Sequence, residues 1–284
     1  MPLQRHIVTL TTDWIDKSYY TSVIEKENIP KSYPIGDHYV AQLKGILRQL
    51  SSEVEIIDIT NSIQAFNTVQ AGFVLHNTYE FFPEGTIHLI GVNSEPSPKN
   101  KIVLVEKYNQ YFIGVNDGLF SIIFEGEPDF IKELAPYNDV FGFSALKLFA
   151  VTVNYIINGK KELIPGNSCT MVKKTYPNPT YDDNSISGSV VFIDHYGNLI
   201  TNVSKELFEN VRNGRAFKIF FKSDKYFIDR ISLYYDDVPK DTHVAIFNSS
   251  NILELAMFKQ NMAQLECIDT LSNIKITFFE GLLF

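Results

Sequence analysis

Cysteine and clustered positive charge are scarce in this sequence. Its 284 residues include two cysteines, Cys169 and Cys267, which lie far apart and have no metal-type partner near them in the chain. A disulfide framework or a zinc site is therefore not expected. The formal net charge is -8 at pH 7, and no run of lysine or arginine occurs. Because a nucleic-acid groove needs clustered positive charge, we do not expect a nucleic-acid partner.

Long apolar runs are also missing. No window approaches the length of a membrane span, and the N-terminal Met-Pro-Leu-Gln-Arg-His lacks the apolar core of a signal peptide. We therefore expect a soluble cytoplasmic protein without membrane contact. Hydrophobic residues nevertheless make up 45% of the chain and aromatic residues 13%, which is ample for a buried core. At this length we expect one large and one small domain.

Strand and helix patterns alternate in the first part of the chain. Short β-branched or apolar runs predict strands, and apolar residues at helical spacing predict helices. The expected strands cover residues 7–12, 55–59, 86–92, 101–105 and 111–115, and the expected helices cover 38–50, 69–82 and 143–158. This alternation predicts an α/β fold class, with a layered N-terminal domain around a mainly parallel central sheet.

Short strands dominate the rest of the chain. They are expected over residues 188–193, 217–221, 244–247 and 274–279. Residues 175–187 are rich in Pro, Asn, Asp and Ser, a composition typical of a linker. We predict an N-terminal α/β domain at 1–174, a linker at about 175–185 and a smaller, mainly β C-terminal domain at 186–284.

The most informative segment is 193–202, Ile-Asp-His-Tyr-Gly-Asn-Leu-Ile-Thr-Asn. An apolar run enters it, Tyr196-Gly197-Asn198 makes a sharp reversal, and an apolar pair begins the return. Tyr196 then offers a ring face for stacking, and the Asn198 carboxamide has a donor and an acceptor side by side, which match the edge of an adenine. The alternative interpretation is an ordinary β-hairpin with Asn-Gly-type turn chemistry.

Further polar positions have both a functional and a local structural interpretation. Asp13 follows a strand expected at the centre of the sheet, where a carboxylate can bind both ribose hydroxyls or serve only as a helix cap or loop residue. Asp37 precedes a helix, where a carboxylate is a favourable cap. Ser249 and Ser250 precede a helix-like run at 252–258, so this segment either binds a carboxylate or phosphate or only caps the helix.

Six segments, taken together, carry a family resemblance. They read Thr-Leu-Thr-Thr-Asp at 9–13, Gly-Asp-His-Tyr-Val-Ala-Gln-Leu-Lys-Gly at 36–45, Phe-Phe-Pro-Glu-Gly-Thr-Ile-His at 81–88, Asn-Asp-Gly-Leu-Phe-Ser at 116–121, Asp-His-Tyr-Gly-Asn-Leu-Ile-Thr-Asn at 194–202 and Asn-Ser-Ser at 248–250. In this order they resemble the S-adenosyl-L-methionine hydroxide adenosyltransferase family, which is related to the bacterial fluorinase and chlorinase. The resemblance covers nearly the whole chain.

The resemblance implies a homotrimer with a β-barrel-like C-terminal domain. Each ligand would lie between the N-terminal domain of one subunit and the C-terminal domain of its neighbour, and S-adenosyl-L-methionine would be the substrate, with no cofactor and no metal. The implied ligand contacts are Asp13 with the ribose hydroxyls, Asp37 with the methionine ammonium, Phe66 as a wall near the ribose, Tyr196, Asn198 and Tyr235 around the adenine, and Ser249 with Ser250 at the methionine carboxylate.

The implied reaction is a displacement at the ribose 5′ carbon, in which water or hydroxide attacks and neutral methionine leaves. Because a sulfonium leaves without acid assistance, the protein has to desolvate, align and activate a water. Family hydrolases use an Asp, an Arg and a His for this, but here Asn93, Asn100 and Ser144 stand at or near those positions. Neither Asn93 nor Ser144 is a base near neutral pH, and loss of a proton acceptor typically costs roughly a hundredfold to ten-thousandfold in rate.

Other residues offer partial replacements. Lys99 or Lys101 could supply the missing positive charge, and Glu95 could accept a proton. Ala145 stands where the fluorinase resemblance requires a halide-binding serine, which argues against halogenation. The long insertion between Asp13 and Asp37 is interpreted either as a lid over the ligand or as a spacer that alters the trimer edge.

Three functions remain open at this point. The first is a hydrolase that converts S-adenosyl-L-methionine to adenosine and L-methionine, with Asn93 and Ser144 at the catalytic positions. The second is a catalytically silent protein that binds S-adenosyl-L-methionine or adenosine as a sensor or reservoir. The third is a structural trimer whose pocket has closed or accepts another nucleoside.

Overall fold

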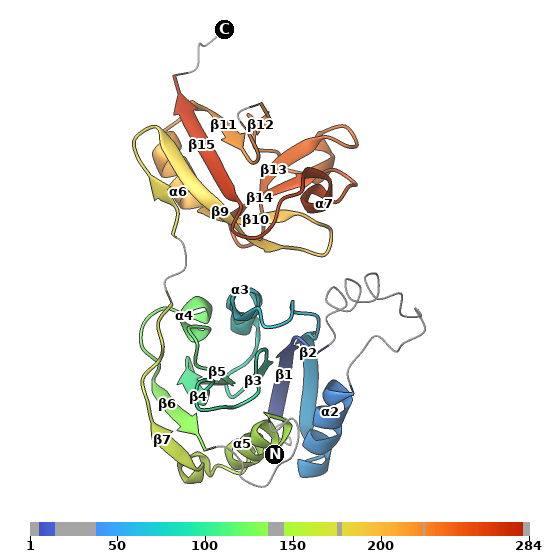
Figure 1. Ribbon diagram of the computed structural model, residues 1–284, viewed down its shortest axis with the longest axis vertical. Helices are drawn as coiled ribbons and strands as arrows, with labels where there is room; N and C mark the ends of the chain where they lie inside the picture. The colour runs from blue at the N-terminus through green and yellow to red at the C-terminus, as the bar shows by residue number, and fades with distance from the viewer. Residues whose placement is uncertain (1–5, 15–37, 136–144, 175–177, 224, 281–284) are drawn as a thin grey trace. The chain divides into compact units, whose positions relative to one another are not determined.

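The computed structural model describes residues 6–14, 38–135, 145–174, 178–223 and 225–280 (Figure 1). The chain divides into two compact units, Met1–Lys174 and Thr175–Phe284. Each unit has its own hydrophobic core. None of the helices within these described ranges is both long and apolar enough to cross a membrane.

A seven-stranded sheet forms the centre of the first unit, in the order β2-β1-β3-β5-β4-β6-β7. Its strands are β1 (His6–Thr12), β2 (Val54–Thr60), β3 (Ile87–Gly91), β4 (Ile102–Lys107), β5 (Gln110–Val115), β6 (Phe130–Leu134) and β7 (Gly166–Ser168). Pairing is parallel from β2 to β5 and antiparallel from β5 to β7. The α/β prediction is confirmed, with antiparallel strands added on one side of the parallel part.

The α-helices in the described part of this unit form two pairs. They are α2 (Tyr39–Leu50), α3 (Thr68–His76), α4 (Phe120–Ile123) and α5 (Ala145–Ile157). Helix α2 packs against α5, and α3 packs against α4 (Figure 1). The connections β1–α2–β2 and β2–α3–β3 cross the sheet in opposite directions, so right-handed crossovers place α2 and α3 on opposite faces.

One edge of this sheet collects the polar residues that follow the parallel strands. Asp13 follows β1, Asn61 follows β2, Asn93 follows β3 and Asp117 follows β5, each within two residues of the strand end. In open α/β sheets, ligands bind at the carboxyl ends of the strands. The sheet therefore brings these four side chains to the edge where binding is expected.

The predicted helix at 69–82 breaks into α3 and a separate 3-10 helix η1 (Tyr79–Phe81). The side chains of Asn77 and Thr78 both donate to backbone carbonyls in the last turn of α3, at 2.9 and 2.5 Å. The Thr78 hydroxyl occupies the Val74 carbonyl, while the Thr78 N–H donates to the Leu75 carbonyl at 2.9 Å, and α3 ends there.

The core of the first unit contains a buried histidine. His88 is fully buried, and its Nδ1 lies 2.8 Å from the Thr9 hydroxyl and its Nε2 lies 2.7 Å from Gln110 Oε1. The Gln110 amide donates to the carbonyls of Tyr79 and Phe82, so its oxygen faces the histidine, and His88 donates from Nε2. Burial lowers the pKa of His88 to about 4, and His88 is neutral at pH 7.

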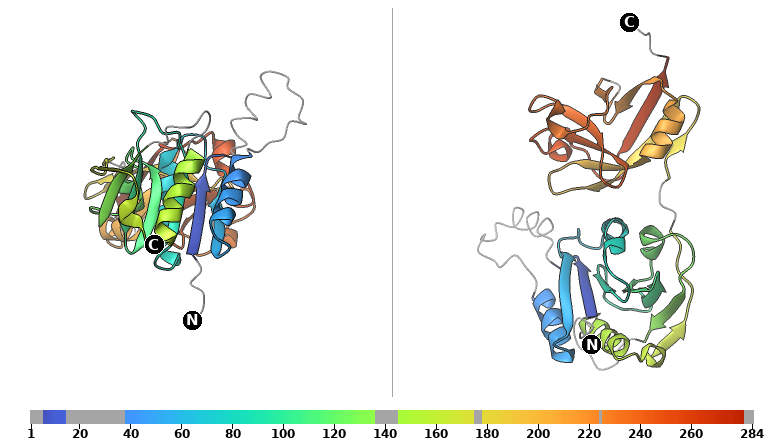
Figure 2. Two further views of the ribbon diagram at one scale, coloured as in Figure 1. Left: turned by 90° about the horizontal axis from the view of Figure 1, so that it is seen from below. Right: turned by 180° about the vertical axis from the view of Figure 1, so that it is seen from behind.

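A sheet of eight strands forms the described part of the second unit, in the order β12-β11-β15-β9-β10-β14-β13, with β8 paired to β9. The strands are β8 (Thr180–Tyr181), β9 (Ser185–Ile193), β10 (Leu199–Ser204), β11 (Ala216–Phe220), β12 (Phe227–Ile228), β13 (His243–Phe247), β14 (Ile252–Met257) and β15 (Asn273–Phe279). Helix α6 (Lys205–Arg212) packs against β9 and β10 (Figure 2). After β12, the Ser232 N–H donates to the Ala245 carbonyl of β13 at 2.8 Å, which nearly closes the sheet and confirms the barrel-like prediction.

The segment expected as a linker, 175–185, contains a strand. Thr180–Tyr181 is β8 and pairs with β9. The polar residues after it form a tight turn, in which the Asp182 carboxylate accepts from the Asn184 N–H at 2.8 Å and the Asp182 N–H donates to the Ser185 carbonyl at 3.0 Å. The Pro, Asn and Asp content therefore reflects turn formation in at least this part of the segment.

The predicted helix at 252–258 is wrong, because Ile252–Met257 is strand β14 between β10 and β13. Leu253 and Leu255 belong to the main core, whereas Ala256 belongs to a smaller cluster on the opposite face. Since both faces of the strand are covered, its sequence is apolar without alternation, and periodicity does not distinguish such a strand from a buried helix.

Candidate functional site

Asn198 and Glu254 share the outer face of the barrel-like sheet. Ile200 of β10 pairs with Glu254 of β14. Because side chains alternate along a strand, Asn198, two residues before Ile200, points to the same face as Glu254, and Leu199 points into the core. The 3-10 helix η3 (Tyr235–Asp237) covers this face through the contact of Tyr235 with Glu254.

A cavity of about 600 Å³ opens at this face. It is lined by Asp194, Tyr196, Asn198, Tyr235 and the run from Met257 to Asn261. Tyr196 is 74% exposed and Tyr235 is 40% exposed, whereas Asn198 is only 7% exposed. The cavity has the volume of a small-molecule site and combines two accessible aromatic rings with one buried amide. The structure thus brings together the three residues predicted around an adenine.

Asp194 shapes the predicted turn at 196–198, which is confirmed. Its Oδ1 accepts from the backbone N–H groups of Tyr196, at 2.9 Å, and of Asn198, at 2.8 Å. Its Oδ2 accepts from the Asn198 side-chain amide at 3.0 Å. One carboxylate therefore fixes both the backbone and the side chain of Asn198.

Gly197 allows the turn to pack on the helix α7 (Met262–Glu266). Its φ is 83°, and a Cβ at this position would lie 2.2 Å from Asn261 Oδ1. The Ala263 N–H of α7 donates to the Gly197 carbonyl at 3.0 Å, and the Asn261 side chain caps the helix by accepting from Gln264 at 2.8 Å. Only glycine combines this backbone conformation with this close approach.

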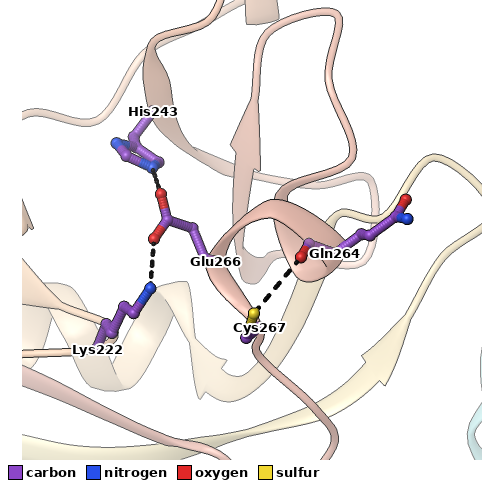
Figure 3. A network of polar contacts seen from close by, with 5 residues as sticks. All are labelled: Lys222, His243, Gln264, Glu266 and Cys267. Carbon is purple, nitrogen blue, oxygen red and sulfur yellow. Dashed lines mark hydrogen bonds and ion pairs between the residues drawn. The ribbon is translucent and has the colours of Figure 1, made fainter.

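His243 of β13 and Lys222, which follows β11, hold the other end of α7. The Glu266 carboxylate accepts hydrogen bonds from His243 Nε2, at 3.0 Å, and from Lys222 Nζ, at 3.1 Å (Figure 3). Partial burial opposes ionisation of Glu266, but the hydrogen bonds from Lys222 and His243 outweigh it and lower the pKa. Cys267 follows with a φ of 54° and ends the helix. Helix α7 is thereby held at both ends, and its N-cap Asn261 lines the cavity.

Glu254 is a buried acid beside the cavity. It is 4% exposed, and it accepts hydrogen bonds from the Tyr235 hydroxyl at 2.5 Å and from the Asn248 amide at 3.5 Å. Burial raises the pKa of Glu254, the Tyr235 hydrogen bond opposes this rise, and the charge of Asp194 adds to it. Burial and the bond to Glu254 also raise the pKa of Tyr235. Glu254 therefore holds Tyr235 and lies beside Asn198, two residues that line the cavity.

Asp237 holds the turn that presents Tyr235. Its carboxylate accepts from the backbone N–H groups of Leu233, at 2.8 Å, and Tyr234, at 3.0 Å. The bond from Tyr234, followed by that from Leu233, lowers the pKa of Asp237. Leu233 and Tyr234 are themselves exposed.

In the first unit, Asp13 joins the ends of three segments. Its Oδ2 accepts from the backbone N–H groups of Phe66, at 2.9 Å, and of Asn93, at 3.3 Å. Both donors have left-handed backbone conformations, with φ of 63° and 48°. The structure therefore brings Asp13, Phe66 and Asn93 together, and the ring of Phe66 is 70% exposed.

Asn100 organises the loop that follows Asn93. Its side-chain amide donates to the carbonyls of Asn93, at 2.5 Å, and Glu95, at 2.7 Å. Asn100 thus has a structural role in this loop and supplies no positive charge. Ser94 lies between these two carbonyls in the chain and is buried, and its hydroxyl has no hydrogen-bond partner among the described residues.

Ser249 and Ser250 are exposed in the turn between β13 and β14. The Asn248 side chain accepts from the N–H groups of Ser250, at 3.0 Å, and Ile252, at 3.2 Å. Because β14 follows in place of a helix, the expected helix N-terminus is absent and the capping interpretation is wrong. Contact of these serines with a carboxylate stays a prediction. Asp37 and Ser144 lie outside the described residues.

Sequence reasoning missed four residues of this region. Asp194, Asn248, Glu254 and Asn261 hold the turns and the cavity wall. Glu254 carried a signal, because it is the lone charge in the apolar run Ile-Leu-Glu-Leu-Ala-Met, and a buried acid requires partners. Within the residues that the structure describes, no group of three or more His, Cys, Asp or Glu is placed to hold a metal ion.

Comparison with known proteins places the chain in a family. Residues 33–163 match the SAM hydroxide adenosyltransferase N-terminal domain, and residues 188–275 match the corresponding C-terminal domain. An (R)-S-adenosyl-L-methionine hydrolase from Methanocaldococcus jannaschii is 24% identical over 290 residues, which cover 96% of each chain.

Two crystal structures share the fold. An uncharacterized conserved protein from Thermotoga maritima has a TM-score of 0.75 and 21% identity, covering 95% of this chain and 99% of its own. A conserved hypothetical protein from Thermus thermophilus has a TM-score of 0.68 and 17% identity, covering 97% and 100%. With both domain models matched in order, this chain belongs to the S-adenosyl-L-methionine hydroxide adenosyltransferase family.

Proposed function

We propose that this protein hydrolyses S-adenosyl-L-methionine to adenosine and L-methionine. The observation that carries the proposal is the cavity of the second unit, where Tyr196 and Tyr235 flank the buried Asn198 amide in a chain of this family. Two ring faces and an amide suit an adenine, which has a flat π-surface and a donor beside an acceptor. The carboxylate of Asp194, which lines the cavity, also favours a cationic sulfonium ligand.

In the reaction, the oxygen of water forms a bond to the ribose 5′ carbon and the bond from that carbon to sulfur breaks. The electron pair goes to sulfur, which leaves as neutral methionine, and the water loses a proton. Asp13 binds the ribose hydroxyls, and Asn93 orients the water. Glu95, exposed in the same loop, accepts this proton. We further propose that the protein acts in the cytoplasm as a homotrimer with sites between subunits.

A silent binding protein is the second candidate. It is favoured by the loop at 93–100, where Asn100 is engaged with two backbone carbonyls and Asn93 is not a base. Binding would then rest on the cavity of the second unit, without activation of water.

The test is incubation of the full-length protein with S-adenosyl-L-methionine in either sulfonium configuration, because the relative from M. jannaschii is named for the R form. Chromatography should show adenosine and methionine in equal amounts. Asp13→Asn and Asn198→Ala should remove the activity, whereas Asp58→Asn and Asn210→Ala, which change exposed residues outside the candidate site, should retain it. Binding without product would select the silent protein, and neither binding nor product would overturn both.

A further inference from the structure

The Asn198 amide is held by Asp194 and lies beside Glu254. Its Nδ2 donates to Asp194 Oδ2 at 3.0 Å, and the side chain is also in contact with Glu254, whose pKa it lowers slightly against the larger effect of burial. Asp194 and Glu254 lie on different elements, the turn after β9 and strand β14. Asp194 therefore fixes the amide, and Glu254 is a second acidic residue next to it.

This arrangement determines which end of the amide faces the cavity. Carboxylate oxygens accept hydrogen bonds, so only the NH₂ group of Asn198 can face Asp194 and Glu254. The reverse orientation would place the Asn198 oxygen against both acceptors. Among the described residues, none donates a hydrogen bond to Asn198 Oδ1, and Asn198 lines the cavity. The oxygen is therefore the group available to a ligand.

Burial makes this orientation costly to reverse. Asn198 is 7% exposed and Glu254 is 4% exposed, so water cannot easily replace a lost partner. Glu254 is itself positioned by the Tyr235 hydroxyl and the Asn248 amide. In such surroundings an unmatched polar group costs more than a matched one gains.

We propose that Asp194 and Glu254 are specificity-determining residues, which lock the Asn198 amide so that its oxygen accepts from the amino group of a 6-aminopurine and rejects a 6-oxopurine. The inference rests on the proposed function, because it assumes that a purine occupies this cavity. An oxo group at the same position would face the Asn198 oxygen with no proton between them. Asp194 and Glu254 act through Asn198 and are positioning residues.

The first experiment needs no variant. Calorimetry with the full-length protein compares adenosine, inosine and purine riboside, which lacks a substituent at position 6. Adenosine should bind at least tenfold more tightly than inosine, and purine riboside should lie between them. No binding of any nucleoside would overturn this inference, and it would overturn the proposed function as well only if the protein also forms no product from S-adenosyl-L-methionine. Equal affinity for adenosine and inosine would overturn the inference alone.

The second experiment combines Asp194→Asn with Glu254→Gln, which replaces the two acidic residues proposed to orient the Asn198 amide. Each new amide keeps one oxygen, for the Tyr196 and Asn198 N–H groups and for the Tyr235 hydroxyl, and offers an NH₂ group toward Asn198. The Glu254→Gln side chain gives up the 3.5 Å hydrogen bond from Asn248. The Asn198 amide should then turn its NH₂ group to the cavity. The adenosine-to-inosine affinity ratio should fall at least tenfold.

A matched control separates this effect from general damage. Glu266→Gln removes a carboxylate from the neighbouring α7 without touching the cavity, and it should leave the ratio unchanged even if it lowers the melting temperature. An unchanged adenosine-to-inosine affinity ratio in a folded double variant would contradict the proposal that Asp194 and Glu254 orient Asn198. If the double variant does not fold, Asp194→Asn alone is measured in the same way, and an unchanged ratio in that folded variant would contradict the proposal.

Discussion

The two units hold their candidate residues by different means. In the first unit, Asp13 is held by backbone N–H groups of Phe66 and Asn93, both in left-handed conformations. In the second unit, Asn198 is held by the side chain of Asp194 and is in contact with Glu254. The position of Asp13 should therefore survive changes to the Phe66 and Asn93 side chains that keep their backbone conformation, whereas the position of Asn198 should depend on side-chain chemistry.

The two units also differ in their buried titratable groups. Burial lowers the pKa of His88 in the first unit to about 4 and raises the pKa of Glu254 in the second. Each group is thereby pushed toward its neutral form. Because one is a base and the other an acid, acidification should affect the two units in opposite directions.

The largest expected effect is the loss of stability of the first unit at low pH. The folded-state pKa of His88, about 4, lies below its unfolded value of about 6.5, so the unfolded chain binds the extra proton between these values. Stability from neutral His88 is complete above pH 6.5 and falls by about 3 kcal/mol as the pH approaches 4. Hydrogen exchange in β3 and β5 peptides, corrected for intrinsic rates, measures this loss.

Hydrogen exchange in peptides of β14, measured in the same samples, provides the internal comparison with the second unit. A raised pKa of Glu254 means that its folded state binds the proton more readily, so its contribution to stability improves as the pH falls and is lost as the pH rises through the folded pKa. In His88→Phe, the pH-dependent loss in the first unit should disappear, although the variant is less stable throughout. Equal losses of stability on acidification in both units of the unaltered protein would contradict the expected difference between them.

Gly197→Ala should have the next largest effect, and it should act on the second unit. The new Cβ would sit 2.2 Å from Asn261 Oδ1 in a backbone with a φ of 83°, so we expect a cost of about 2 kcal/mol and weaker adenosine binding. Gly214→Ala is the matched control, since Gly214 has a φ of 75° and open space around it. It should cost about 1 kcal/mol from the backbone alone. Equal costs in urea denaturation would mean that Asn261 moves away freely.

Local patterns predicted most of the fold because they are decided by neighbouring residues. The turn at Tyr196-Gly197-Asn198 and the strands on either side depend on chemistry within ten residues. Strand β14 was mistaken for a helix because both of its faces are buried, and an apolar run of six residues fits either structure. Its pairing partners, β10 and β13, decide the matter, and they are tertiary contacts.

The candidate site was predicted only where its residues carry a recognisable local signal. Asn198 stands in a turn motif, but its partner Glu254 is 56 positions later and meets it only because β10 pairs with β14. The left-handed conformation of Asn93 is likewise set by the packing of the loop around Asn100 and Asp13. Such contacts arise from the assembled sheet, and no spacing in the chain encodes them.

The difference between the units is tested most sharply by a substitution that should raise the catalytic activity of the first unit. Asn93→Asp introduces a carboxylate at a position where aspartate, like asparagine, tolerates the left-handed backbone. The nearby Asp13 should raise its pKa toward neutrality, which suits a proton acceptor, and we expect turnover of S-adenosyl-L-methionine to rise about tenfold. Asn93→Gly keeps the backbone conformation without a side chain and should show no gain. Suppose that Asn93→Asp folds and binds adenosine as before without turning over S-adenosyl-L-methionine any faster. In that case, proton acceptance at this edge does not limit the reaction, and the difference between the units does not explain the rate of turnover.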